Sequence, residues 1–264
     1  MKLLEGKTAL IFGVANDHSI AWGIARTMYA HGAKLAFSYA SPALERRVRP
    51  LAEQVEATFV EQCDVARDED IEAVFAKAAE TLGAIDILVH AIAFANRDDL
   101  FAPFHETSRE GFRLAMDISV YSLIVLARSA APLMTGGGSL LTLTYYGGQK
   151  VVPNYNVMGV AKAALEATTR YLAVDLGPQG IRVNAISAGP IRTLSAAGVS
   201  GFKRMHRQFT AIAPLKRGVT IDDIGGAAVW LASDLASTVT GEVLFVDSGY
   251  NILGFAAQVG QEPE

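Results

Sequence analysis

The chain has 264 residues, of which 51% are hydrophobic and 19% are charged, a composition typical of a globular protein and unlike that of a disordered one. Its formal net charge of −4 gives no overall positive field, so we expect no nucleic-acid partner. The single cysteine, Cys63, excludes an internal disulfide and a metal site built on two cysteines. We therefore expect a reducing, cytoplasmic location and no bound metal.

The first residues, MKLLEGKTALIFGV, contain a short apolar run interrupted by glycines. This pattern predicts a first β-strand and not a secretion signal, because no longer apolar core with a small-residue cleavage pattern follows. A membrane helix needs about 18 or more unbroken apolar residues, and no window approaches that length. We expect no insertion into a membrane.

Short apolar runs, several without polar alternation, then alternate with longer amphipathic stretches. This order predicts parallel strands joined by helical crossovers, with helices covering both faces of the sheet. The expected fold is α/β, a single-domain doubly wound Rossmann-type fold with a mainly parallel seven-stranded sheet. The predicted domain spans 1–256, with a basic, substrate-binding segment at 193–218 and a flexible tail at 257–264. The predicted strands are Thr8–Phe12, Lys34–Tyr39, Thr58–Gln62, Asp86–His90, Ser139–Thr144, Arg182–Ile186 and Val243–Val246.

The loop after the first strand is the first candidate site. Gly13 would let the chain turn sharply, and Ser19 is a candidate helix N-cap, so first-turn N–H groups would face a pyrophosphate. The fingerprint G-x-G-x-x-G is absent, and an ordinary strand–helix turn explains this loop equally well.

Residues after the second and third strands bear on an adenosine moiety. Asp64 could accept a hydrogen bond from an adenine amino group, although it could instead cap the helix that begins near Asp68. Ala40 and Ser41 supply neither an acid for a ribose diol nor a cation for a 2′-phosphate. NADH is therefore favoured over NADPH.

The candidate reacting groups are Tyr155 and Lys162, at the start of a helix predicted from about Pro153 to Leu176. Seven residues span almost two helical turns, so the phenol and the ammonium lie on one face. The lysine could hold ribose hydroxyls, and its charge would favour a phenol hydrogen bond to a substrate oxygen. A tyrosine and a lysine at this spacing also occur by chance in amphipathic helices.

Several motifs together carry a family resemblance: the loop Gly13–Ala21, the Cys63-Asp-Val65 turn, Tyr145 ten residues before Tyr155, and the strings PNYNVMGVAK and NAISAGPIRT. Between Gly6 and about Gly254 the sequence resembles the bacterial enoyl-acyl-carrier-protein reductases, a divergent branch of the short-chain dehydrogenase/reductases. The resemblance implies an NADH-dependent oxidoreductase of fatty acid biosynthesis and lipid metabolism, an acyl carrier protein partner and a homotetramer.

The same resemblance implies roles for individual residues. It assigns catalysis to Tyr145, Tyr155 and Lys162 and places Ala95 near the substrate. Ala93 stands where the family often has glycine, which would change the shape of the acyl pocket. The implied cofactor-binding residues are Gly13, Ser19, Ile20, Ala40, Asp64, Val65, Ile92, Lys162, Ile191, Arg192, Thr193, Leu194 and Ser195.

Two other functions remain as alternatives. A short-chain carbonyl or alcohol oxidoreductase could use Thr142 with the tyrosine–lysine pair, but the sequence has His90-Ala-Ile-Ala93 where such enzymes carry N-N-A-G. They also place an asparagine where Asp117-Ile-Ser119 stands, and they have no role for Tyr145. A catalytically silent dinucleotide-binding regulator would lose the tyrosine–lysine pair, which this chain keeps.

The expected reaction is hydride transfer from NADH to the β-carbon of a trans-2-enoyl thioester, with the Tyr155 hydroxyl meeting the enolate oxygen. The acidic carrier would dock on the segment 202–207, because no Asp or Glu occurs between Leu176 and Ile221 while seven cations do. The alternative without a functional role is that these cations form a solvent-exposed helix face.

Overall fold

The computed structural model describes residues 2–193 and 202–254. In these ranges the chain forms a seven-stranded sheet in the order β3-β2-β1-β4-β5-β6-β7, with every neighbouring pair parallel. All seven predicted strands are present, and their predicted ends differ from the observed ones by no more than two residues. The strands are β1 (Thr8–Phe12), β2 (Lys34–Tyr39), β3 (Phe59–Gln62), β4 (Ile87–His90), β5 (Gly138–Thr144), β6 (Ile181–Ala188) and β7 (Val243–Val246).

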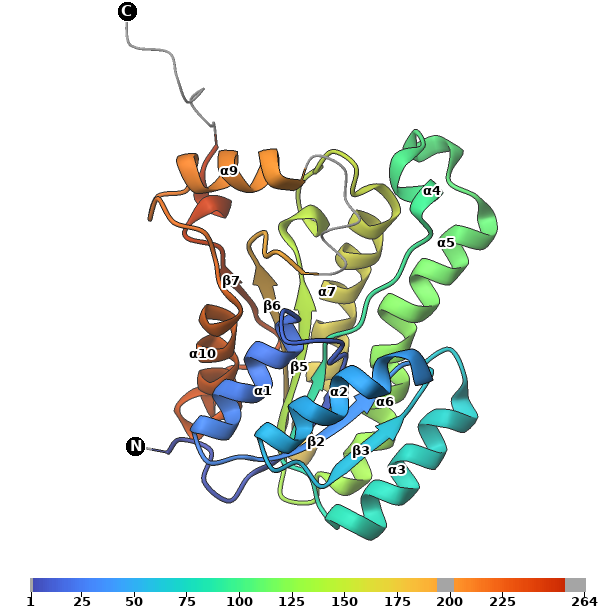
Figure 1. Cartoon of the computed structure of the whole chain (residues 1–264), viewed down its shortest axis with the longest axis vertical. Helices are drawn as coiled ribbons and strands as arrows, with labels where there is room; N and C mark the ends of the chain where they lie inside the picture. Colours follow the sequence, from blue (N-terminus) through green and yellow to red (C-terminus); the bar gives the residue numbers. More distant parts are fainter. Residues whose placement is uncertain (1, 194–201, 255–264) are drawn as a thin grey trace, which may run out of the picture.

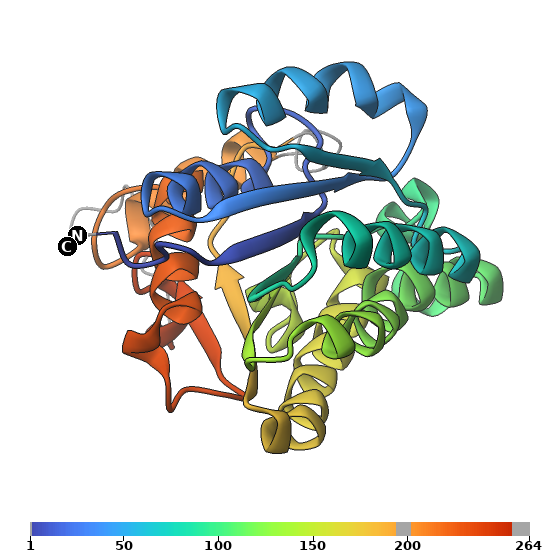
Figure 2. The ribbon, with the colours of Figure 1, turned by 90° about the horizontal axis from the view of Figure 1, so that it is seen from below.

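Helices cover both faces of the sheet, as Figure 2 shows from below. On one face, α1 (Ile20–Ala30), α2 (Pro42–Gln54) and α10 (Ile221–Ala232) bury apolar side chains in one core cluster. On the other, α3 (Asp68–Leu82), α6 (Ser122–Ala130) and α7 (Asn156–Leu176) share a second cluster. The expected doubly wound α/β fold is confirmed.

Shorter elements connect these helices or lie at the carboxyl ends of the strands. Figure 1 shows α4 and α9 at the end of the molecule toward which the β5 and β6 arrows point. The remaining helical elements are α4 (Arg97–Phe101), α5 (Arg109–Met116), α9 (Phe202–Ile212), the π-helical turn η2 (Asp117–Tyr121), and the 3-10 turns η1 (Phe104–Glu106), η3 (Ala131–Leu133), η4 (Tyr146–Gly148), η5 (Gly177–Gln179), η6 (Asp234–Ala236) and η7 (Tyr250–Ile252).

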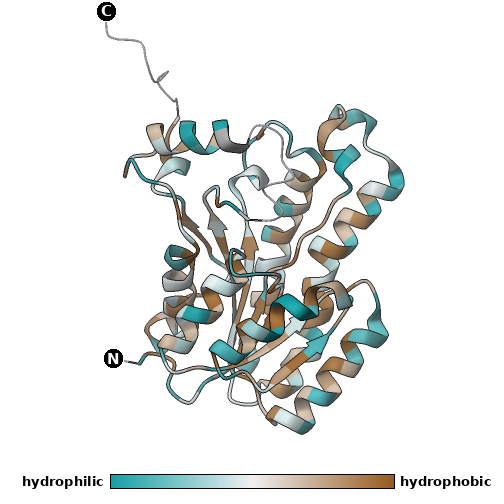
Figure 3. Ribbon diagram, in the orientation of Figure 1, coloured by the Kyte–Doolittle hydropathy of each residue, from teal (hydrophilic) through white to brown (hydrophobic). Residues whose placement is uncertain are grey.

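The central strands are buried on both faces, which explains their lack of polar alternation. Strand β1 is buried from Ala9 to Phe12, and the apolar colour of Figure 3 follows the strands and the inward sides of the helices. One helical stretch, Arg109–Leu133, is long and apolar enough to cross a membrane by length and composition alone, with a mean hydropathy of 1.5. Half of its most apolar window is buried against the rest of the protein, as in a core helix.

Helix α1 is held close to α10 by two glycines. A Cβ atom on Gly23 would lie 2.5 Å from the Cβ of Ile221, and one on Gly225 would lie 2.2 Å from the hydroxyl of Thr27. Neither position has room for a larger residue, so the axes of the two helices can approach closely. This contact fixes α1, whose first turn faces the carboxyl end of β1.

Candidate functional site

The carboxyl ends of β1 and β4 form the point where the order of the sheet reverses. From β1 the chain builds outward through β2 and β3, whereas β4 to β7 lie on the other side of β1. Open α/β sheets bind their ligands in the crevice at such a point. The sequence-predicted loops all follow strands that end at this edge.

The turn between β1 and α1 has the expected geometry. Gly13 has a φ of +105°, and a Cβ atom there would lie 2.2 Å from the carbonyl oxygen of Ala91. Ser19 caps α1, since its hydroxyl accepts a hydrogen bond from the Trp22 N–H at 3.3 Å. Ile20 is the first helical residue. The positive end of the α1 dipole therefore lies at the carboxyl end of β1, where it favours an anion.

Asp64 and Val65 follow β3 after the single residue Cys63, and Ala40 directly follows β2. The capping alternative for Asp64 is wrong: Arg67 occupies the N-cap of α3, and the Asp64 carboxylate accepts a hydrogen bond from the Ala66 N–H at 3.0 Å. This short turn fixes the carboxylate at the strand end. Ala40 is exposed.

Tyr145, Tyr155 and Lys162 come together at the carboxyl end of β5. The rings of Tyr145 and Tyr155 meet edge to face, with centroids 5.0 Å apart. Lys162 is buried, and its ammonium donates a hydrogen bond of 2.8 Å to the carbonyl oxygen of Leu143. Burial lowers the pKa of Lys162 to about 8, raises that of Tyr145 to about 12 and raises that of Tyr155 further. At neutral pH both phenols keep their protons and the lysine keeps its charge.

Helix α7 begins later than the sequence predicted. The expectation was a start near Pro153, but the first helical residue is Asn156 and Tyr155 is the N-cap. Asn154 has a left-handed φ of +62°, so this residue cannot be part of the right-handed helix, which starts after it. The Asn156 side chain donates to the carbonyl oxygens of Leu100 and Ala102, at 2.9 and 2.7 Å, and so ties the start of α7 to the α4 region.

Two further loops reach the same edge. After β4, Ile92 and Ala95 pack against the second core cluster, and the exposed Ala93 lies between them. The backbone of Phe94 is held by the Ser119 hydroxyl, which accepts from its N–H at 3.0 Å and donates to its carbonyl oxygen at 3.1 Å. After β6, Ile191 is buried, Arg192 is exposed and Thr193 is half-buried. Leu194 and Ser195, predicted to contact the cofactor, lie outside the described residues.

The sequence reasoning missed a buried histidine network. His90 is fully buried, with Nδ1 2.9 Å from the Thr142 hydroxyl and Nε2 2.8 Å from the Ser122 hydroxyl. Burial and the charge of Lys162 lower the pKa of His90 to about 3, so the imidazole is neutral. Thr142 is engaged inside the protein by His90, which argues against the serine-like role that the carbonyl-reductase alternative gave it.

Glu166 was missed as well. Its buried carboxylate accepts hydrogen bonds from the Thr144 hydroxyl at 2.8 Å and from the Gln149 side-chain amide at 3.1 Å. The available signal was its spacing, because position 166 is one helical turn beyond Lys162 and lies on the same face.

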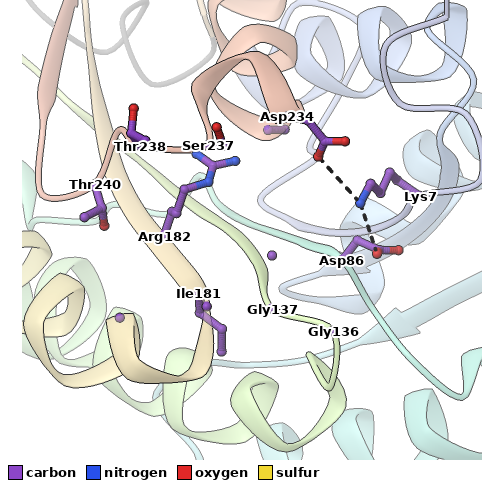
Figure 4. Close-up of a pocket in the computed structure, with 14 residues that line it drawn as sticks. Lys7, Asp86, Gly136, Gly137, Ile181, Arg182, Asp234, Ser237, Thr238 and Thr240 are labelled. Carbon is purple, nitrogen blue, oxygen red and sulfur yellow. Dashed lines mark ion pairs between the residues drawn. The ribbon is translucent and has the colours of Figure 1, made fainter.

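A separate cavity of ≈ 370 Å³ lies at the amino ends of the strands, away from these residues. Figure 4 shows Lys7 between Asp86 and Asp234, with nitrogen–oxygen distances of 3.8 and 3.9 Å. Arg182 donates to the carbonyl oxygens of Leu231 and Ser233. Both cations of this cavity, Lys7 and Arg182, have partners within the protein, and none of the residues predicted to react lines it.

Comparison with known proteins gives one family. The profile of the family described as Enoyl-(Acyl carrier protein) reductase matches residues 13–251. The chain is 57% identical to enoyl-acyl-carrier-protein reductase (NADH) FabI of Bacillus cereus, with 96% of this chain and 100% of that protein covered. It is 53% identical to the Aquifex aeolicus protein of the same name, with 96% and 94% covered.

Comparison with solved structures points to the same family. A Bacillus cereus enoyl-acyl carrier protein reductase with NADP+ and an indole naphthyridinone has a TM-score of 0.95 at 57% identity, covering 97% of this chain and 100% of that one. A reductase from Anaplasma phagocytophilum in complex with NAD has a TM-score of 0.94 at 50% identity, covering 97% and 98%.

Proposed function

The chain belongs to the enoyl-(acyl carrier protein) reductase family, and we propose that Tyr155, Lys162 and Tyr145 form the site of its reaction. The enzyme uses NADH to reduce the carbon–carbon double bond of trans-2-enoyl-acyl carrier protein thioesters in fatty acid biosynthesis. The observation that supports this site is the edge-to-face pair of Tyr145 and Tyr155 at the strand edge where the buried Lys162 lies.

The residues of the crevice fit a dinucleotide. The N-terminus of α1, with Gly13, Ser19 and Ile20, would hold the pyrophosphate. The Lys162 ammonium has three N–H donors, of which one bonds Leu143, so it can also bind ribose hydroxyls. The other proposed contacts are Ala40, Asp64, Val65, Ile92, Ile191, Arg192, Thr193, Leu194 and Ser195.

The chain's own groups would act on the thioester oxygen. NADH supplies the hydride that the β-carbon receives. Tyr155 keeps its proton, because burial raises its pKa, and can donate a hydrogen bond to the oxygen as the enolate forms. The ring of Tyr145 packs against that of Tyr155 and limits its orientation. Lys162 would orient the cofactor and favour the developing negative charge.

Further parts of the proposal concern the substrate and the assembly. We propose that Ala95 and the segment 193–218 border the acyl chain within one domain of residues 1–256, and that residues 202–207 receive the carrier protein. We also propose a homotetramer. Exposed apolar side chains on α6 and α7 support self-association, among them Tyr171 at 77% exposure and Val174 at 76%.

A substrate panel tests the proposed function. We expect the protein to oxidise NADH rapidly with crotonyl-type thioesters and poorly with acetoacetyl-type thioesters, measured by the loss of absorbance of NADH. Faster turnover of the acetoacetyl substrate would instead identify a carbonyl reductase.

A further inference from the structure

Glu166 contacts both ends of the turn that carries Tyr145. Thr144, the last residue of β5, comes immediately before Tyr145, and Gln149 comes immediately after η4. Each donates a hydrogen bond to a different oxygen of the Glu166 carboxylate. One side chain on α7 therefore closes the whole turn onto the helix that also carries Lys162.

The turn packs closely around this contact. A Cβ atom on Gly148 would lie 3.1 Å from the Glu166 Oε1 atom, and one on Gly147 would lie 2.5 Å from the Tyr155 ring. The turn thus lies directly against both Glu166 and Tyr155. A displacement of the Glu166 carboxylate would move the Tyr145 backbone and, through Gly147, the Tyr155 ring.

Glu166 also carries the negative charge that acts on Lys162 from one helical turn away. Burial lowers the pKa of Lys162, and the charge of Glu166 opposes that effect. The other groups facing Lys162 give no such help, because His90 is neutral and both phenols keep their protons. Acids on the remaining elements packed against α7 are Asp117 on η2, Asp98 and Asp99 on α4, of which Asp99 accepts from Ser108, and Glu110 on α5, which pairs with Arg113.

We propose that Glu166 is a positioning residue of the reductase site: its carboxylate fastens both ends of the Tyr145 turn to α7 and places a negative charge one helical turn from Lys162. The inference rests on the proposed function for the roles of Tyr145 and Lys162. Glu166→Gln removes the charge together with the oxygen that accepts from Gln149, whereas Gln149→Ala removes that hydrogen bond and leaves the charge. Comparison of the two variants therefore separates the effect of the charge from that of the hydrogen bond.

The charge is tested by Glu166→Gln, which keeps the size of the side chain and its capacity to accept from Thr144. Without the charge Lys162 loses its proton at lower pH, so the fall in NADH affinity on the alkaline side should move down by roughly one pH unit. NADH affinity is measured by fluorescence titration between pH 6 and pH 9. Glu166→Asp keeps the charge and should leave that pH dependence as in the wild type. Asp117→Asn is the matched control, which removes a neighbouring acid.

The hydrogen bonds are tested by Gln149→Ala, which releases one end of the turn and leaves the charge in place. We expect kcat to fall by roughly tenfold with NADH affinity kept at every pH. Circular dichroism melts verify that each variant is folded. If Glu166→Gln does not fold, Gln149→Ala still tests the proposal, because a wild-type kcat in that variant would contradict the fastening of the turn.

Two further results would overturn the proposal. One is a folded Glu166→Gln enzyme with wild-type kcat and a wild-type pH dependence of NADH binding. The other is a shift of that pH dependence in Glu166→Asp or Asp117→Asn as large as in Glu166→Gln. A wild-type protein inactive on enoyl thioesters would contradict the proposed function, whereas the NADH titrations would still test Glu166.

Discussion

Replacement of Tyr155 and replacement of Lys162 should affect kcat and NADH affinity differently, because the proposed partners of the two side chains differ. Tyr155→Phe removes the donor to the substrate oxygen and should lower kcat by about 100-fold with NADH affinity unchanged. Lys162→Ala should weaken NADH binding as well, since the ammonium would hold the ribose. Fluorescence titration and steady-state kinetics measure the two effects, and equal NADH affinity in Lys162→Ala and the wild type would contradict this division of roles.

The residues after β2 set the expected cofactor preference. Ala40 is exposed and offers no cation, and Arg46 and Arg47 lie exposed on α2. We expect a higher kcat/KM with NADH than with NADPH, and Ala40→Arg should raise the relative efficiency with NADPH about tenfold. If the wild type prefers NADPH, Arg46→Ala and Arg47→Ala will identify the cation that reaches the 2′-phosphate.

Buried His90 should make the protein less stable in acid. Its pKa is about 3 in the folded chain and near the ordinary value of about 6.5 in the unfolded chain. Between these two values the unfolded chain binds more protons, so the free energy of unfolding falls as the pH falls.

In His90→Gln the glutamine amide replaces the imidazole as a hydrogen-bond donor and acceptor, but it cannot titrate. Its urea midpoint should therefore fall less between pH 7.5 and pH 5 than that of the wild type, and His105→Gln, on the surface, should behave as the wild type does. An unchanged pH dependence in His90→Gln would show that the network tolerates a charged imidazole.

The sequence predicted residues whose role depends on local geometry. Gly13 at a sharp turn and Ser19 at a helix N-cap follow from backbone rules that act over a few residues. His90 and Glu166 were missed because their partners are distant in sequence: Ser122 and Thr142 reach His90 only after β4 and β5 pair and α6 packs on the sheet. The delayed start of α7 depends on a left-handed asparagine, which helix periodicity does not indicate.

At the scale of elements, all seven strands were predicted because each contains a short apolar run between longer amphipathic stretches. Five of them, β1, β2, β4, β5 and β6, are mostly buried, whereas β7 is half-buried. Helix α9 was not predicted as a separate element, since the segment 193–218 is rich in small and basic residues. It packs over the strand ends: the rings of Phe209 and Tyr250 lie 5.0 Å apart, and a Cβ atom on Gly189 would lie 3.0 Å from Phe209. Such long-range packing is not visible in the local pattern.

Two of the seven cations whose run supported a carrier-docking segment at 202–207 are engaged within the protein. Arg182 bonds to backbone carbonyl oxygens, and Arg217 forms two hydrogen bonds with Asp223, at 2.9 and 3.0 Å. Arg204 and Arg207 are exposed on α9, at the end of the molecule where the strands terminate. The side chain of Lys203 lies outside the described residues.

Reversing Lys203, Arg204 and Arg207 to glutamate should lower kcat/KM for carrier-linked enoyl substrates more than for coenzyme A-linked ones. The loss should shrink as salt rises, because salt screens the attraction that speeds encounter with an acidic carrier. Lys34→Glu reverses a single cation at the start of β2, at the opposite end of the sheet, and should have no such effect. Equal losses on both substrates would mean that α9 only shapes the pocket.

At the scale of the whole molecule, α6 and α7 expose apolar side chains that an isolated chain leaves in water. Val160, Tyr171 and Val174 lie on α7, and Tyr121 and Ile124 lie at or near the start of α6. Positions 160 and 171 are about three helical turns apart and therefore share a face. Burying such a face against a second copy would gain roughly 25 cal/mol for each Å² of apolar surface removed from water.

Charge on this face should therefore break the proposed tetramer into smaller species. We expect the double variant Tyr171→Glu, Val174→Lys to sediment as monomer or dimer, and its melting temperature to depend less on protein concentration than that of the wild type, because fewer subunits associate in the folded state. Ala79→Glu, which adds charge to an exposed position of α3, should sediment as the wild type does. Because Lys162 and Glu166 lie on the same helix, the smaller species should also bind NADH more weakly if the interface holds α7 in place. A double variant that still sediments as a tetramer would move the interface to another face of the molecule.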